Sequence, residues 1–319
     1  MKPNEYQHRS NTVTQRSLSV NGLTLHYREL LPDEANDLPP VLLLHGFPTS
    51  SYLWRNMMSA ISKGVRAEDA HAEASAADAA TVTTAAGTAG ALQRRVIALD
   101  LPGYGESSKT LEHSYSFKFY ERALNDFLRA LEIDRLHLVV HDIGGPIGLY
   151  WAIHRPEAVA SMTLLNTVVY SDFSWAVILF LASCKLPGLR HLLASPLGLK
   201  LSLDIGMAQR DKITPELIRQ MQLPFQTAEA RQALLKAGAG LHPKGFKDIE
   251  SGLDKLNMPL RMIYGVKDRI LPDIAKTAQR LQARFPQMTV TALPHCGHFL
   301  QEDDPEQVGN LLSEFIAGR

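Results

Sequence analysis

Residues 138–146 read LVVHDIGGP, and this stretch is the most informative one in the chain. An apolar run leads into a polar pair, two glycines and then a proline that opens a helical pattern, where its missing N–H costs little. The order predicts a strand, a sharp turn and a helix, with Asp142 projecting from the turn. Because backbone N–H groups and the dipole at a helix start favour negative charge, we expect the Asp142 carboxylate to be ionised.

Short apolar runs without helical period recur on both sides of this turn, which indicates strands covered on both faces. Helical patterns lie between several of them, and Asn21-Gly22 suits the tight turn of an initial hairpin. We therefore predict an α/β fold with a mostly parallel, twisted sheet and helices on both faces. The predicted strands are 14–19, 24–29, 41–44, 95–99, 136–140, 162–165, 261–264 and 289–293, and the predicted helices are 117–131, 148–155, 274–285 and 306–316.

Two stretches interrupt this alternation. Residues 67–91 consist mainly of Ala, Thr, Ser and Gly and predict a low-complexity surface insertion within a core that spans 1–169. Residues 170–258 are helix-rich and too long for a plain crossover, so we expect a helical cap inserted over the carboxyl edge of the sheet, where such sheets bind ligands. Residues 259–319 then return to the core and complete the sheet.

Charge and composition narrow the classes of function. The chain of 319 residues carries 33 basic and 33 acidic side chains, which offers no general attraction to nucleic acid. Two cysteines fit a reducing compartment, and the polar start of the chain lacks the apolar core of a signal peptide. We expect a cytoplasmic protein, a monomer or weak homo-oligomer, without stable membrane insertion, although an apolar surface helix could still touch a membrane.

The aspartate at the turn determines which chemistry is expected. A carboxylate can attack a saturated carbon, displace a halide or open an epoxide, and form an ester on the enzyme. Water then attacks the carbonyl of that ester. An Asp142 that merely caps the following helix is the competing interpretation, and the turn by itself does not separate the two.

Two further residues complete a possible triad. His298 lies in a loop after the last predicted strand, where a neutral imidazole can activate water, and His295 is its rival three residues earlier. Asp268 follows the strand at 261–264, the position of a residue that orients the histidine, although turn aspartates are common. The order nucleophile, acid, histidine is that of the α/β-hydrolase triad.

Backbone groups of two turns are expected to form an oxyanion hole. The turn at 45–48 (HGFP) is predicted to contribute the N–H of Phe47, and Ile143 the second N–H. The loop at 100–108 (DLPGYGESS) lacks the ending of a phosphate loop and the glycine spacing of a dinucleotide site, so it is interpreted as structural. We expect no metal, because no further ligands join the two histidines near the end of the chain, and no organic cofactor.

Four motifs together resemble the haloalkane dehalogenases of the α/β-hydrolase superfamily, and epoxide hydrolases share two of them. These motifs are 45–56 (HGFPTSSYLWRN), 100–108 (DLPGYGESS), 139–145 (VVHDIGG) and 297–305 (GHFLQEDDP). The resemblance implies Asp142 as nucleophile, His298 as base and Asp268 as the orienting acid. The alternative position of the acid, after the strand at 162–165, carries Asn166 here, which supports Asp268.

The chain departs from this resemblance at the leaving-group site. Haloalkane dehalogenases place a Trp after the nucleophile and an Asn in the HG turn, whereas Ile143 and Phe47 offer no side-chain N–H. Trp175 and Asn166 are the candidate pocket residues that could substitute. Epoxide hydrolases use two cap tyrosines, and the predicted cap holds only Tyr170. We expect a dehalogenase-like hydrolase of small apolar substrates; an epoxide hydrolase, a β-lactone-cleaving enzyme and a ligand receptor on the same fold stay open.

Overall fold

The computed structural model describes residues 12–63, 93–317 and 319. Eight strands form one sheet in the order β1-β2-β4-β3-β5-β6-β7-β8, in which β2 is antiparallel to both neighbours and the other pairs are parallel. The predicted α/β fold with a mostly parallel sheet is therefore confirmed. The strands are β1 (Thr14–Val20), β2 (Leu23–Leu30), β3 (Val41–Leu44), β4 (Val96–Leu99), β5 (Leu136–Asp142), β6 (Val159–Thr167), β7 (Leu260–Gly265) and β8 (Thr289–Leu293).

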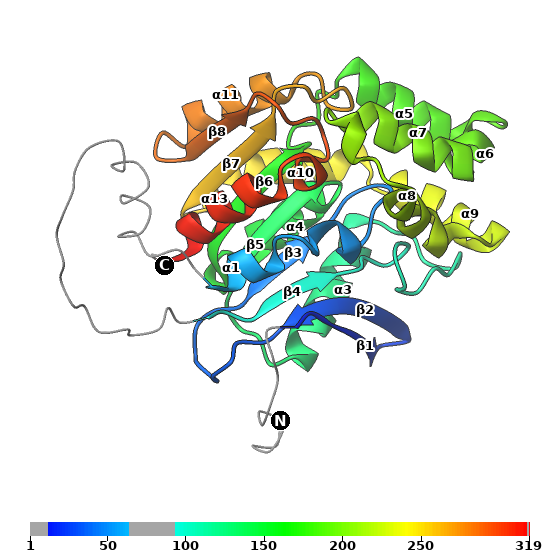
Figure 1. Cartoon of the computed structure of the whole chain (residues 1–319). Helices are drawn as coiled ribbons and strands as arrows, with labels where there is room; N and C mark the ends of the chain where they lie inside the picture. Colours follow the sequence, from blue (N-terminus) through cyan, green and yellow to red (C-terminus); the bar gives the residue numbers. More distant parts are fainter. Residues whose placement is uncertain (1–11, 64–92, 318) are drawn as a thin grey trace.

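Helices cover both faces of the sheet (Figure 1). Helices α1 and α13 pack together on one face, and α3, α4 and α10 form a layer on the other. The α-helices are α1 (Met58–Lys63), α3 (Phe117–Ala130), α4 (Gly144–His154), α5 (Trp175–Lys185), α6 (Leu189–Leu193), α7 (Pro196–Gly206), α8 (Pro215–Gln222), α9 (Ala228–Gly238), α10 (Pro243–Gly252), α11 (Ile274–Arg284), α12 (Leu300–Asp303) and α13 (Pro305–Ala317). Short 3-10 turns occupy Ser51–Trp54, Pro156–Ala158, Arg210–Lys212, Leu223–Phe225 and Leu253–Lys255.

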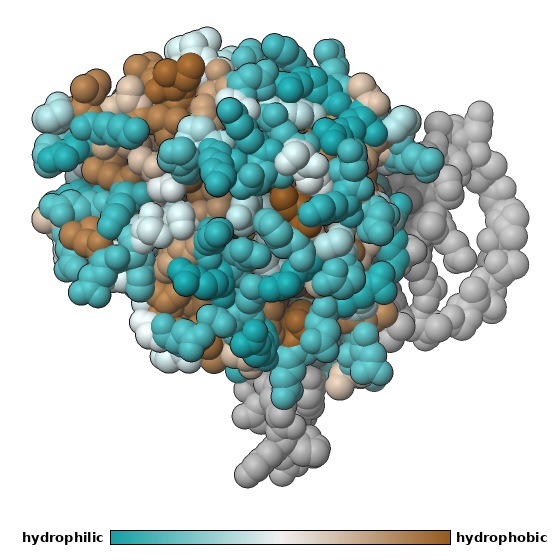
Figure 2. All heavy atoms as spheres, turned by 180° about the vertical axis from the view of Figure 1, so that it is seen from behind, coloured by the Kyte–Doolittle hydropathy of each residue, from teal (hydrophilic) through white to brown (hydrophobic). Residues whose placement is uncertain are grey.

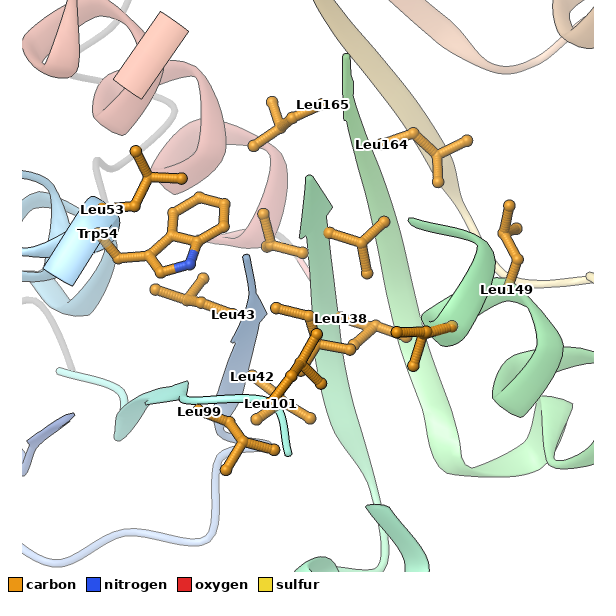
Figure 3. Packing of buried hydrophobic residues seen from close by; sticks show 14 of the residues in the cluster. Leu42, Leu43, Leu53, Trp54, Leu99, Leu101, Leu138, Leu149, Leu164 and Leu165 are labelled. Atoms are coloured by element: carbon orange, nitrogen blue, oxygen red, sulfur yellow. The ribbon is translucent and has the colours of Figure 1, made fainter. Parts of the chain in front are cut away.

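The central strands are mostly apolar because helices bury both of their faces. All four residues of β3 are buried, and successive residues of β6 point to opposite faces, as Leu164 and Leu165 show in Figure 3. Trp54 packs beside Leu43 on one side of the sheet, and Leu149 of α4 lies on the other. Fully burying a leucine contributes roughly 1.5–3 kcal/mol, so this double-sided core is a large share of the stability.

The first hairpin differs from this pattern because β1 lies at the edge of the sheet. Its residues alternate between half-buried and exposed, and its turn holds Asn21 and Gly22 at φ values of +47° and +79°. Those left-handed values favour the two residue types that the turn contains. The predicted hairpin is thus found where the Asn-Gly pair placed it.

Helices α5–α9 lie beyond the carboxyl edge of the sheet (Figure 1). Helix α10 instead packs on α4, with Gly252 so close to Ile153 that an added Cβ would lie 2.8 Å from its Cδ1. The layer above the edge is therefore made by α5–α9, and the boundaries 170–258 of the cap remain a prediction. The predicted insertion at 67–91 lies outside the described residues. Among those that are described, no helix is long and apolar enough to cross a membrane.

Candidate active site

The turn between β5 and α4 holds Asp142 in an uncommon backbone conformation. Its φ is +51°, and the register of β5 against β6 shifts between His141 and Asp142. A left-handed conformation is costly for a residue with a side chain and persists only where the surroundings enforce it. Helix α4 starts directly at Gly144, so the predicted helix at 148–155 began four residues too late: the glycine pair itself forms the first helical turn.

Glycines allow three backbone segments to meet at this turn. A Cβ on Gly46 would lie 2.2 Å from the Cβ of Asp142, and one on Gly145 would lie 1.6 Å from Oγ1 of Thr167. The same Thr167 hydroxyl donates a hydrogen bond to the Asp142 carbonyl at 2.6 Å. The HG and GG motifs are thus explained by close approach of backbone, which leaves no room for a side chain.

The Asp142 carboxylate is held from two sides. Its Oδ1 accepts a hydrogen bond from the N–H of Phe47 at 2.8 Å, and its Oδ2 lies 3.3 Å from Nε2 of His298. Burial acts to raise the pKa of Asp142, but the nearby charged imidazole of His298 outweighs it and lowers the pKa below its usual value. Asp142 is therefore an anion with one oxygen fixed and the other facing the histidine.

The structure brings Asp268 and His298 together, as the chain order predicted. Nδ1 of the fully buried His298 lies 2.9 Å from Oδ2 of Asp268, while the N–H groups of Ile270 and Leu271 donate to Oδ1 of Asp268 at 2.8 Å each. Burial acts to lower the pKa of His298, but the charges of Asp268 and Asp142 raise it to about 10. The imidazole between these two carboxylates is therefore protonated at neutral pH. The rival His295 is exposed to solvent.

Asn166 lies beneath the triad and not in a pocket, which corrects the prediction that it lines the substrate site. The side chain is fully buried. Its Nδ2 donates to Oδ2 of Asp268 at 2.7 Å and to the Gly297 carbonyl at 3.1 Å, and its Oδ1 accepts the N–H of Gly265 at 2.9 Å. These bonds leave the amide unavailable to a leaving group and make Asn166 a positioning residue for Asp268.

Sequence reasoning missed a role for His141, although it adjoins Asp142 in the motif. Its Nε2 lies 2.9 Å from the carbonyl oxygen of His298, and the two rings lie 4.8 Å apart. Burial, and then the charge of His298, lower the pKa of His141 to about 3. The neutral ring must carry its proton on Nε2, because a carbonyl can only accept. His141 thus fixes the backbone of the loop that presents His298.

The loop at 100–108 supports the HG turn from below, in line with its structural interpretation. Asp100 accepts the N–H groups of Ser51 at 2.6 Å and Glu106 at 2.8 Å, and its Oδ2 lies 2.8 Å from Nδ1 of His26. His45 is also structural, since its Nε2 accepts the N–H of Leu101 at 3.1 Å. Together these bonds hold the turn that carries the Phe47 N–H.

A cavity of about 410 Å³ lies between Asp142 and the cap, and its wall is mainly apolar. Trp175, predicted to lie in the pocket, is part of this wall, as are Phe47 and Ile143. Sequence reasoning missed Arg269, which also lines the cavity and directly follows Asp268 in the chain. The further lining residues are Pro48, Pro146, Val168, Phe173, Ala176, Val177, Leu179, Phe180, Leu181, Ser183, Leu193, Ser202, Ile205, Gly238, Leu241, Phe246, Ile270 and Leu271.

Other reactive groups do not compete with this site. Cys184 and Cys296 are buried and free, and burial raises the pKa of each thiol to about 12, so neither is a thiolate at neutral pH. Within the described ranges, no three His, Cys, Asp or Glu side chains are grouped so that they could hold a metal ion.

Comparison with known proteins places this geometry in a family. The model of the alpha/beta hydrolase fold matches residues 39–305. The chain belongs to the alpha/beta hydrolase fold family. It is 25% identical to a haloalkane dehalogenase of Agrobacterium fabrum over 87% of this chain and 84% of that protein, and 29% identical to an uncharacterized hydrolase of Bacillus subtilis over 69% and 80%.

Comparison with a solved structure also indicates similarity to the haloalkane dehalogenases. The crystal structure of a haloalkane dehalogenase from Bradyrhizobium elkani matches this alpha/beta hydrolase with a TM-score of 0.76 and 25% identity, and the match covers 96% of this chain and 98% of that one. The predicted resemblance to the haloalkane dehalogenases is confirmed, and the chain is a hydrolase of this fold.

Proposed function

We propose that this hydrolase uses Asp142 to displace a leaving group from a carbon of a small apolar substrate, in the manner of a haloalkane dehalogenase. The observation that carries the proposal is a carboxylate, not a hydroxyl, at the turn between β5 and α4, with Oδ1 bound by the Phe47 N–H and Oδ2 facing His298. The mainly apolar cavity beside it fits a small apolar substrate. No metal or organic cofactor is needed.

In the first step Oδ2 of Asp142 attacks the substrate carbon, because Oδ1 is already held by the Phe47 N–H. A carbon–oxygen bond forms and the carbon–halogen bond breaks, so the halide leaves with the bonding electrons. The product is an ester on Asp142, and the negative charge of the carboxylate is gone.

In the second step His298 activates water against that ester. Loss of the Asp142 charge removes one of the two carboxylates that raise the pKa of His298, so its pKa falls and it releases a proton to solvent. The neutral imidazole then takes a proton from water, and the oxygen attacks Cγ of Asp142. The N–H groups of Phe47 and Ile143 stabilise the charge on Oδ1, and collapse yields the alcohol, with one proton and one halide released overall.

The cavity offers two side-chain donors for the departing halide. The hydroxyls of Ser183 and Ser202 donate to carbonyl oxygens of their own helices at 2.8 Å and 3.0 Å, and so are already used. In the described part of the chain, neither the Trp175 indole nor the Arg269 guanidinium has a hydrogen bond or ion pair. We assign the leaving-group site to these two residues, in place of the donors that Ile143 and Phe47 lack.

The side chains that line the cavity also argue against epoxide opening. Ring opening needs an acid that protonates the alkoxide, which the epoxide hydrolases supply with tyrosines. No tyrosine is among the described residues that line the cavity, and Tyr170 lies instead under the guanidinium of Arg280, 3.5 Å from its ring centre. A halide needs no proton, so the wall suits dehalogenation better. A cytoplasmic location and a monomeric or weakly oligomeric state stay predictions.

The test is the intact mass of the His298→Ala variant after exposure to haloalkanes, epoxides and lactones. Loss of the base stalls hydrolysis, so we expect an added alkyl mass on Asp142 together with released halide. Asp142→Asn should show no adduct, and His295→Ala should turn over like wild type. An added hydroxyalkyl mass would identify an epoxide hydrolase. No adduct from any pool, with inactive wild type, would overturn the proposal in favour of a lactone-specific enzyme or a receptor.

A further inference from the structure

Large apolar side chains gather on the outer surface of helices α5–α7. Figure 2 shows this surface as a brown area at the upper left. In the described part of the chain, nine of the twelve large hydrophobic residues that are exposed lie here, with exposed fractions from 39% to 67%. We call these nine the cap face: Trp175, Ile178, Leu179, Leu186, Leu189, Leu192, Leu197, Leu201 and Ile205.

Within α5 and α7 the residues of the cap face follow the helical period, so those of each helix share one side. On α7, Leu197, Leu201 and Ile205 are spaced four residues apart and share one side of the helix. On α5, the apolar run WAVILFLASCK leaves only Cys184 buried. Surface helices usually turn their apolar side to the core. An apolar side that faces solvent therefore favours a partner that covers it.

The charge around the cap face is positive, although the chain as a whole is neutral. Residues 175–205, which carry the cap face, contain three basic side chains and one acidic one, Asp204. Lys185 and Arg190 are exposed, and Lys200 pairs with Asp204 at 2.6 Å. Two uncompensated cations thus lie beside the apolar surface, which is the combination that interfacial helices present to anionic lipid.

The cap face also continues into the cavity. Trp175, Leu179 and Ile205 belong to the cap face and at the same time line the cavity that contains Asp142. The apolar outer surface and the mainly apolar cavity wall therefore share these three residues.

We propose that the cap face docks on an anionic phospholipid surface and that apolar substrate enters the cavity from that side. Docking would bury leucine and tryptophan side chains at the level of the headgroups, and each cation near an anionic surface adds electrostatic attraction. A second copy of the chain fits less well. In a two-fold interface the same patch meets itself, so the unpaired cations Lys185 and Arg190 of both copies would be brought to one interface, where Asp204, already paired with Lys200, is the one acidic residue among 175–205. The docking does not depend on which bond the enzyme cleaves.

The binding test uses sedimentation of the full chain with vesicles of phosphatidylglycerol and phosphatidylcholine in equal parts, and with phosphatidylcholine alone. We expect binding to the anionic vesicles that weakens with salt. The variant Leu197→Ser/Leu201→Ser should lower the partition coefficient by about 10-fold or more, because it removes apolar contact. Lys185→Glu/Arg190→Glu should lower it on anionic vesicles alone. None of the four residues lines the cavity, so turnover of a water-soluble substrate should stay unchanged.

A control variant and the fluorescence of one tryptophan distinguish docking through the cap face from nonspecific adsorption to vesicles. Leu223, exposed outside the cap face, provides the control Leu223→Ser, which should bind like wild type. Of the three tryptophans, Trp54 and Trp151 are buried and Trp175 is 67% exposed, so quenching of tryptophan emission by brominated lipid reports Trp175. Vesicle binding with this quenching supports the proposal. Absent binding, equal binding by the variants, or a dimer that only the cap-face substitutions dissociate would overturn it.

Discussion

At the scale of single residues, the site is governed by two carboxylates and one imidazole. Asp142 and Asp268 both lie within hydrogen-bonding range of His298 or close to it, at 3.3 Å and 2.9 Å. While both are charged, His298 holds a proton firmly, and the carboxylate of Asp142 is an anion ready to attack. The first step of the proposed reaction removes one charge and thereby prepares the base for the second step.

This coupling predicts different pH dependences for the two steps. Ester formation needs ionised Asp142, whose pKa is lowered, so its rate should be flat from about pH 6 to about pH 9. Ester hydrolysis needs neutral His298, so its rate should rise with pH through a pKa below the value of about 10 in the free enzyme. Rapid-quench mass spectrometry should therefore find more ester at acid pH. An ester fraction independent of pH would contradict the assignment of His298 as base.

A second prediction concerns the leaving group. Arg269→Gln removes the cation of the cavity wall, and a hydrogen bond to a charged group contributes about 1.5–3 kcal/mol. We expect kcat/KM for chlorinated substrates to fall by roughly 10- to 100-fold and product inhibition by halide to weaken. Arg269→Lys, which keeps the charge, should recover part of the rate. Because the side chain is exposed, the free energy of unfolding should be unchanged, and equal halide affinity in Arg269→Gln would contradict the assignment.

At the scale of elements, the turn between β5 and α4 works only because its neighbours are small. The variant Gly145→Ala would place a Cβ 1.6 Å from Oγ1 of Thr167, and we expect a loss of about 3 kcal/mol from overpacking. Gly22→Ala is the control: it meets no atom within 4 Å, and only its φ of +79° costs about 1 kcal/mol. Urea unfolding measures both. Equal losses would mean that space at Gly145 is not limiting.

Local patterns predicted those elements whose composition is unambiguous. The strands at 41–44 and 289–293 are found as β3 (Val41–Leu44) and β8 (Thr289–Leu293). The strand at 162–165 was too short, since β6 runs from Val159 to Thr167 and includes polar residues that the apolar pattern excluded. One of them, Ser161, is satisfied within the sheet, where its hydroxyl lies 2.8 Å from Nδ1 of His137. A polar residue with a cross-strand partner is invisible to a pattern of hydrophobicity.

Around the triad, too, some residues could be predicted from the sequence and others could not. Position after a strand and order along the chain made Asp142, Asp268 and His298 candidates, and the resemblance to the haloalkane dehalogenases implied their roles. The role of Asn166 was not accessible, because its partner Asp268 is 102 residues away and the contact depends on β6 and β7 being neighbours. Arg269 could have been noticed as a charged residue directly after Asp268, but its place in the cavity wall depends on how the cap closes over the sheet.

At the scale of the whole molecule, the sheet brings the residues of the site together. The residues that meet at its carboxyl edge come from five strand ends: Phe47 after β3, Asp142 at the end of β5, Asn166 in β6, Asp268 after β7 and His298 after β8. Each strand is anchored in the apolar core, so the edge is rigid although it carries buried charge. The cost of that buried charge should appear in the dependence of stability on pH.

We predict that the free energy of unfolding is greatest near pH 6.5 and falls on both sides. His298 has a folded pKa of about 10 against an ordinary 6.5, so its contribution is complete below pH 6.5 and is lost as pH rises through 10, by up to about 5 kcal/mol. His137 and His141, whose pKa burial lowers to about 3, act in the opposite sense and lose their contribution as pH falls from 6.5 toward 3. Asp100, with its pKa lowered to about 2, adds a loss below pH 4.

Urea unfolding across this range tests the prediction, and His298→Ala tests the alkaline limb. Without the imidazole, the proton that the folded state holds as pH rises above 6.5 is absent, so stability should no longer decline between about pH 6.5 and 8.5. Above that interval Cys184 and Cys296, whose pKa burial raises to about 12, still add a loss of their own. The acid limb should persist, because His137, His141 and Asp100 are untouched. A variant whose stability still declines between about pH 6.5 and 8.5 would show that His298 is not held protonated between Asp142 and Asp268. The order of proton transfers proposed for the reaction would then fail.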